Sequence, residues 1–161
     1  MEWLWTPWRM EYIKGADSAE SCFLCEAPNL DPEQDDRSYI LHRGRDAFVI
    51  LNIYPYNTGH LMVAPYRHTA DLESLGADEG LEGFGLLRRS VEALKEAFQP
   101  HGFNIGMNLG RVAGAGIPDH LHFHVVPRWG GDTNFMPVLS DTKVLPEMLD
   151  ETYAKLKPLF A

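Results

Sequence analysis

The chain has 161 residues, of which 45% are hydrophobic, and a formal net charge of −9 at pH 7. A chain of this size can bury one core, so we expect a single domain over residues 1–161. The acidic balance argues against a protein held on nucleic acid or an anionic membrane by its overall field. No segment approaches the length of a membrane span, and the first residues lack the regions of a secretion signal, so we expect a cytoplasmic protein.

Residues 1–36 show no clear hydrophobic period and end in a polar, turn-rich run, so we expect an irregular N-terminal arm. The arm contains both cysteines of the chain, Cys22 and Cys25, in a Cys-x-x-Cys knuckle. In a chain without secretion features this spacing favours metal or redox chemistry over a structural disulfide. A zinc site with two more distant ligands is one interpretation, and a redox dithiol or two buried thiols are the alternatives.

The middle of the chain predicts an antiparallel meander followed by a long helix. Short apolar runs bounded by turn residues predict strands at 38–42, 47–52 and 60–64. Over residues 78–98, apolar side chains recur every three or four positions and predict one helix, which Pro100 ends. The apolar stripe of this helix consists of Leu81, Phe84, Leu87, Val91, Leu94 and Phe98.

Two more strands, at 102–108 and 120–126, and a last helix at 146–156 complete the expected elements. Together the elements predict an α+β fold, with an antiparallel sheet of about five strands, one long central helix and a C-terminal helix. No internal repeat or low-complexity segment interrupts the pattern.

The segment 120–126, His-Leu-His-Phe-His-Val-Val, alternates histidines with apolar residues. On a strand the apolar residues would enter the core, while His120, His122 and His124 would share the other face. Imidazoles two residues apart lie roughly 6.6 Å from each other, so one face could contact several phosphates or a metal. A solvated strand face is the alternative. Three cationic neighbours would repel one another, which favours a ligand.

The histidine run and its flanks resemble the signature of the histidine triad (HIT) nucleotide hydrolases and transferases. The run is followed by Pro127-Arg128-Trp129, and the resemblance covers about residues 22–129. Further matching motifs are Asn52-x-x-Pro55, Gly59-His60-Leu61-Met62-Val63 and Met107-Asn108. Within the superfamily, residues 5–13 and the tail at 127–135, Pro-Arg-Trp-Gly-Gly-Asp-Thr-Asn-Phe, look like the bacterial diadenosine tetraphosphate phosphorylase branch.

The resemblance implies a reaction that passes through a nucleotidyl-histidine. His122 takes the position of the nucleophile, and a hydrogen bond from one ring nitrogen would determine which nitrogen attacks. His124 takes the position of a residue that binds a nonbridging phosphate oxygen. His60 corresponds to a fourth histidine that supports the triad by hydrogen bonding. A structural His124 and a core His60 are the alternatives.

Residues 110–117 form a glycine-rich loop that is suited to present backbone N–H groups to phosphate. Asn52 matches a residue that hydrogen-bonds ribose hydroxyls, and capping of the following turn is its alternative role. Asn108 can donate an amide hydrogen bond to a phosphate oxygen. Many family members carry Gln and Ser or Thr in this loop, so a side-chain hydroxyl contact is missing here. The full set of expected substrate contacts is Asn52, Asn108, Arg111, Gly114, Ala115, Gly116 and Ile117.

In family branches with a Cys-x-x-Cys knuckle, the first triad histidine and one after the fourth-histidine strand complete a zinc site. These residues correspond to His120 and His68, so the implied ligands are Cys22, Cys25, His68 and His120. With all four positions filled by protein, the zinc would be structural.

The resemblance therefore implies cleavage of a nucleoside polyphosphate at an α-phosphate, through an AMP adduct on His122. We expect a diadenosine tetraphosphate phosphorylase, for which inorganic phosphate is the acceptor. The alternatives are a hydrolase of dinucleoside polyphosphates or AMP conjugates, a non-catalytic nucleotide-binding regulator, and an enzyme that binds metal through all three triad imidazoles. Family members form homodimers, which implies a homodimer here, with a nucleotide substrate and neither nucleic acid nor membrane as partner.

Overall fold

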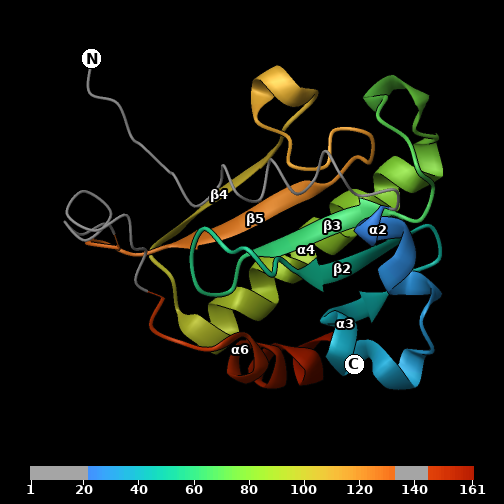
Figure 1. The fold of residues 1–161 in the computed structure, drawn as a ribbon. Coiled ribbons are helices and arrows are strands. Elements are labelled where there is room, and N and C mark those ends of the chain that lie inside the picture. Colours follow the sequence, from blue (N-terminus) through green and yellow to red (C-terminus); the bar gives the residue numbers. More distant parts are fainter. Residues whose placement is uncertain (1–21, 133–144) are drawn as a thin grey trace, which may run out of the picture.

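The computed structural model describes residues 22–132 and 145–161, so the whole N-terminal motif at 5–13 and the end of the 127–135 motif lie outside the described residues. Its centre is a five-stranded antiparallel sheet in the order β1-β2-β3-β5-β4 (Figure 1). The strands are β1 (Ile40–Arg43), β2 (Ala47–Leu51), β3 (Leu61–Pro65), β4 (Gly102–Met107) and β5 (Phe123–Arg128). The predicted sheet is confirmed, with strand ends that differ by up to three residues.

The sheet is covered on both faces, which explains why β2 is buried at every position. Because side chains alternate along a strand, Val49 and Leu51 pack into one apolar cluster together with the long helix α4 (Ala77–Phe98). Phe48 and Ile50 pack into a second cluster on the opposite face, together with the short helix α2 (Phe23–Glu26). Figure 1 shows α4 crossing behind the sheet and α2 in front of it.

The central helix is confirmed, but the apolar stripe predicted for it is partly wrong. Leu81 and Phe84 are 74% and 70% exposed. The buried face of α4 includes the small residues Gly83, Ser90 and Ala93 together with leucines further along. Since each residue turns the helix by about 100°, a face centred on these small residues points Leu81 and Phe84 toward solvent.

The expectation of an irregular arm over residues 1–36 is wrong for its described part, residues 22–36. This segment forms a series of short helices: α2, a 3-10 helix (Ala27–Asn29), a second 3-10 helix (Pro32–Gln34) and α3 (Asp35–Ser38). Three- and four-residue helices are too short to show a hydrophobic period. Their signals are local, since Pro28 and Pro32 occupy first-turn positions and the Asp31 carboxylate accepts a hydrogen bond from Glu33 N.

The C-terminal helix is confirmed as α6 (Leu149–Leu156), followed by a 3-10 helix (Lys157–Phe160). It begins later than predicted because Met148 has an extended backbone and acts as the N-terminal flanking residue. Two further 3-10 helices (Leu72–Ser74 and Arg111–Ala113) lie in the connections. Within the described ranges, none of the helices is long and apolar enough to cross a membrane.

Candidate active site and metal centre

The alternation predicts that the three triad histidines share one face of a regular strand. The structure has a different arrangement. Strand β5 begins at Phe123, so only His124 lies within it. The preceding residues are held by a different segment, because Leu121 N donates to Thr69 O at 2.7 Å. This displaces His120 from the row: its ring packs edge-on against His68, while the rings of His122 and His124 remain neighbours with centroids 4.8 Å apart.

His122 has one ring nitrogen fixed by the backbone. Its Nδ1 lies 2.8 Å from the carbonyl oxygen of His120, and the side chain is buried. A carbonyl can only accept a hydrogen bond, so Nδ1 carries the proton and Nε2 keeps its lone pair. Burial lowers the pKa of His122, against the opposing effect of the hydrogen bond to His120. The imidazole is therefore neutral near pH 7 and presents an unprotonated Nε2, the form that a nucleophile requires.

His60 connects the backbone of its own loop to His124. The backbone N–H of Tyr56 donates to His60 Nδ1 at 3.0 Å, so that nitrogen is an acceptor. The proton of neutral His60 is then on Nε2, which lies 2.9 Å from His124 Nδ1. Neutral His124 consequently carries its proton on Nε2 and can donate to an oxygen of a substrate. The Tyr56 ring stacks on His60 with centroids 4.8 Å apart.

The other predicted substrate residues lie in two loops. Asn52 follows β2, where its Oδ1 accepts from Tyr54 N at 2.9 Å and its Nδ2 lies 3.4 Å from His60 Nδ1. The first contact is the turn-capping role that was its alternative. In the glycine-rich loop, Asn108 Nδ2 donates to Gly114 O at 3.4 Å. Asn52 therefore adjoins the histidine cluster, and Asn108 stabilises the loop from within.

The glycine-rich loop adopts the backbone that its glycines permit. Gly110 and Gly114 have φ angles of 79° and 90°, in the region that favours glycine. They flank the 3-10 helix that carries the exposed Arg111. Ala115 is buried, and Ile117 packs against the second apolar cluster. Ile117, which is half-buried, therefore attaches this end of the loop to the core.

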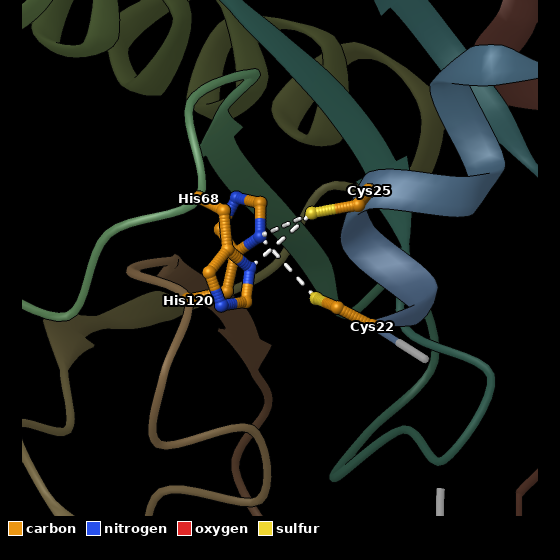
Figure 2. A group of neighbouring side chains, drawn as sticks. All are labelled: Cys22, Cys25, His68 and His120. Atoms are coloured by element: carbon orange, nitrogen blue, oxygen red, sulfur yellow. Dashed lines mark hydrogen bonds between the residues drawn. The ribbon is translucent and has the colours of Figure 1, made fainter. Parts of the chain in front are cut away.

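The two cysteines and two histidines predicted as metal ligands lie together (Figure 2). One sulfur and one nitrogen are 3.3 Å apart in two pairs, Cys22 with His120 Nδ1 and Cys25 with His68 Nδ1. All four candidate ligand atoms lie within 4.8 Å of one another. Two sulfur and two nitrogen donors at such separations fit a four-coordinate metal ion.

His120 is oriented toward this cluster by the strand behind it. Its Nε2 lies 2.8 Å from the carbonyl oxygen of Pro65, so Nε2 donates and Nδ1 faces the sulfurs as a lone pair. Burial lowers the pKa of His120 and favours this neutral form. Without a metal, burial and the neighbouring Cys22 raise the pKa of the Cys25 thiol to about 11. A bound cation would reverse that effect by stabilising the thiolate.

The chain is similar to known proteins in both sequence and structure. The family model described as HIT domain matches residues 33–131. The chain is 41% identical over 157 residues to the AP-4-A phosphorylase of Mycobacterium tuberculosis, covering 92% of this chain and 79% of the relative. It is 30% identical over 95 residues to the bis(5'-nucleosyl)-tetraphosphatase [asymmetrical] of Schizosaccharomyces pombe, covering 59% of this chain and 52% of that one. A Zn-bound histidine triad family protein from Mycobacterium smegmatis has a similar structure, with a TM-score of 0.67, 25% identity, and coverage of 87% and 93%.

Proposed function

Because the chain belongs to the HIT domain family, we propose that it is an enzyme that cleaves dinucleoside polyphosphates at an α-phosphate through a covalent AMP adduct on His122. The observation that carries this proposal is the hydrogen bond from His122 Nδ1 to His120 O, which leaves Nε2 with its lone pair. His122 and His124 are neighbours, so a phosphate attacked by the first can receive a hydrogen bond from the second.

In the first half-reaction, His122 Nε2 attacks the α-phosphorus and forms a P–N bond. The bond from that phosphorus to the bridging oxygen breaks, and its electron pair leaves with the departing nucleotide. His124 donates its Nε2 proton in a hydrogen bond to a nonbridging oxygen, where negative charge develops. The Tyr56, His60 and His124 hydrogen bonds hold that donor in place before the substrate arrives.

In the second half-reaction, an acceptor oxygen attacks the same phosphorus and the P–N electron pair returns to His122. We infer that inorganic phosphate is the acceptor, which makes the enzyme a diadenosine tetraphosphate phosphorylase. The relative named AP-4-A phosphorylase, similar over most of the chain, supports this choice. Arg111 and the backbone N–H groups around Gly110 and Gly114 are the groups that would hold the second anion.

Hydrolysis is the second candidate, because the loop offers no hydroxyl between Ala115 and Ile117 to help bind phosphate. The similarity to a tetraphosphatase supports this alternative. The reaction products distinguish phosphorolysis from hydrolysis. Diadenosine tetraphosphate with inorganic phosphate should yield ADP and ATP if phosphate is the acceptor. AMP and ATP, in amounts unchanged by added phosphate, would instead make the protein a hydrolase.

We further propose that the ion bound by Cys22, Cys25, His68 and His120 is structural zinc. Tetrahedral zinc, about 2.3 Å from sulfur and about 2.0 Å from nitrogen, separates those ligands by roughly 3.5 Å, close to the contacts observed. The Zn-bound relative supports the identity of the metal. Bound zinc would join α2 to two distant segments and contribute folding free energy without taking part in a chemical step.

We also propose that the protein is a cytoplasmic homodimer. Strand β4 lies at an edge of the sheet, and its residues Asn104, Ile105 and Gly106 are exposed. An edge strand can pair with a second copy, which supports a dimer across β4. Light scattering at micromolar concentration tests this: the mass of a single chain would overturn the dimer.

A further inference from the structure

An ion pair at the end of β5 reaches into the loop between β2 and β3. Arg128 donates from Nε and Nη2 to the two carboxylate oxygens of Asp132, at 2.6 and 2.9 Å. The carboxylate also accepts from Asn57 Nδ2 at 2.8 Å, and the same amide donates to Pro127 O at 3.1 Å. Arg128 Nη1 donates to Asn104 Oδ1 at 2.6 Å, so the pair is attached to β4 as well.

The turn after β5 brings Asp132 back to Arg128. Gly131 has a φ of 79°, which glycine adopts without strain, and Asp132 N donates to Trp129 O at 3.2 Å. The Asp132 side chain is only 10% exposed. The bidentate hydrogen bonds from Arg128 hold the pKa of Asp132 well below its usual range. The carboxylate is thus charged and fixed, and it presents a strong acceptor to Asn57.

Asn57 transmits this anchoring to His60. Its carbonyl oxygen accepts from His60 N at 3.1 Å. The preceding residue, Tyr56, directs its backbone N–H at His60 Nδ1. Tyr56 directly precedes Asn57, so fixing Asn57 at both its side-chain amide and its backbone carbonyl limits the backbone rotations that set the direction of the Tyr56 N–H. That N–H determines which nitrogen of His60 carries the proton, and therefore what His60 presents to His124.

We propose that the three residues Arg128, Asp132 and Asn57, named here the clamp, are positioning residues that keep His124 in the tautomer with its proton on Nε2. In this role they act through Tyr56 and His60 and touch no substrate. The consequence for catalysis rests on the proposed function, because only a reaction at phosphate uses that proton. The tautomers themselves can be measured without any substrate.

The clamp is distinguished from a merely structural ion pair by the protonation pattern of two imidazoles. Long-range proton–nitrogen correlation spectra of protein labelled with ¹⁵N-histidine, recorded at pH about 8, report which ring nitrogen carries the proton. In the wild-type protein we expect Nε2–H for both His60 and His124. In Asn57→Ala we expect His124 to become a mixture of both tautomers. A wild-type His60 or His124 with its proton on Nδ1 would overturn the proposal.

Turnover provides the second readout. We expect Asn57→Ala to lower kcat roughly tenfold with little change in KM, since one oriented donor contributes at most about 10² to 10³ in rate. Asp132→Asn keeps the shape of the side chain but weakens the clamp, and it should shift the spectra in the same direction. If both variants keep wild-type tautomers, the clamp does not position His124.

A matched control is available just before the C-terminal helix α6. Glu147 forms an ion pair with Lys155, and its side chain is 12% exposed, close to the value for Asp132. Glu147→Gln should leave the imidazole spectra and kcat unchanged. If it reproduced the tautomer mixture, the effect would be general destabilisation, and the proposal would be overturned. If the wild-type protein shows the expected tautomers and the clamp variants lose them, but no AMP adduct forms on His122, the proposed reaction is refuted and the clamp stands.

Discussion

His120 and His122 are joined by a hydrogen bond in which the backbone carbonyl of His120 accepts from Nδ1 of His122 at 2.8 Å. The side chain of the same His120 faces Cys22 and Cys25, with Nδ1 3.3 and 3.4 Å from the two sulfurs. His120 therefore belongs to both the candidate active site and the candidate metal centre. A metal ion held by its imidazole would also hold the carbonyl that orients the proposed nucleophile.

Loss of a metal ligand should destabilise the fold. We expect Cys22→Ser and His68→Ala to abolish stoichiometric zinc binding. If the loss costs about 3 kcal/mol of unfolding free energy, Tm should fall by roughly 6–12 °C for a chain of this size. Elemental analysis and thermal unfolding with and without a chelator measure both effects. His101→Ala, which removes an exposed histidine elsewhere, is the control. Wild-type protein that binds no zinc after reconstitution would refute the site.

The pH dependence should follow the neutral form of His122. Because burial lowers the pKa of this imidazole, the nucleophile stays unprotonated below the ordinary histidine value of about 6.5. We expect kcat/KM to be level from pH 8 down through 6.5 and to fall only at lower pH. Zinc content should be measured at each pH, so that metal release is not mistaken for titration. An acid limb centred above 6.5 would contradict this assignment.

Arg111 should contribute more to the binding of the acceptor, inorganic phosphate, than to the binding of the dinucleotide. If it helps to hold inorganic phosphate, Arg111→Ala should raise the KM for phosphate about tenfold, since charged hydrogen bonds contribute about 1.5–3 kcal/mol and this one is exposed. The KM for the dinucleotide should change less. Arg88→Ala, at an exposed position on α4, serves as the control. Equal effects of Arg111→Ala on both KM values would argue against a separate acceptor site.

The orientation of α4 can be tested by a pair of substitutions. Leu94 is fully buried in the cluster between α4 and the sheet, whereas Phe84 is largely exposed. We expect Leu94→Ala to lower the unfolding free energy by about 2–5 kcal/mol. Phe84→Ala should change it by less than about 0.5 kcal/mol. Urea denaturation followed by circular dichroism measures both. A cost above 2 kcal/mol for Phe84→Ala would mean that this face is covered.

The fold could be predicted where a pattern repeats over enough residues. Apolar runs and the 3.6-residue period predicted strands at 47–52 and 60–64 and a helix at 78–98, and the structure has them within one residue at each end. The short helices between Cys22 and Ser38 were missed, because one helical turn contains no period. The buried face of α4 was misplaced, because a count of large apolar residues overlooks small ones such as Gly83.

The candidate site likewise contains some residues that could be predicted from the sequence and others that could not. The family motif points to the four metal-ligand positions, and the structure brings them together. The clamp was missed because Asn57 and Asp132 are 75 positions apart and no sequence period links them. The Tyr56 contribution was also missed, since it comes from a backbone N–H that any residue type except proline could supply. The Trp-Gly-Gly-Asp segment at 129–132 was a sequence signal for the clamp, but it was interpreted as a motif of one family branch.

The AMP adduct on His122 is the most direct test of the proposed reaction. Wild-type protein and the variant His122→Asn would each be mixed with diadenosine tetraphosphate without added phosphate, quenched in base, and mapped by peptide mass spectrometry. The P–N bond of such an adduct survives alkaline conditions better than acid. We expect AMP on His122 of the wild-type protein and none on the variant, which should still bind the nucleotide. AMP on another residue, or near-normal turnover by His122→Asn, would contradict the assignment of His122 as the nucleophile.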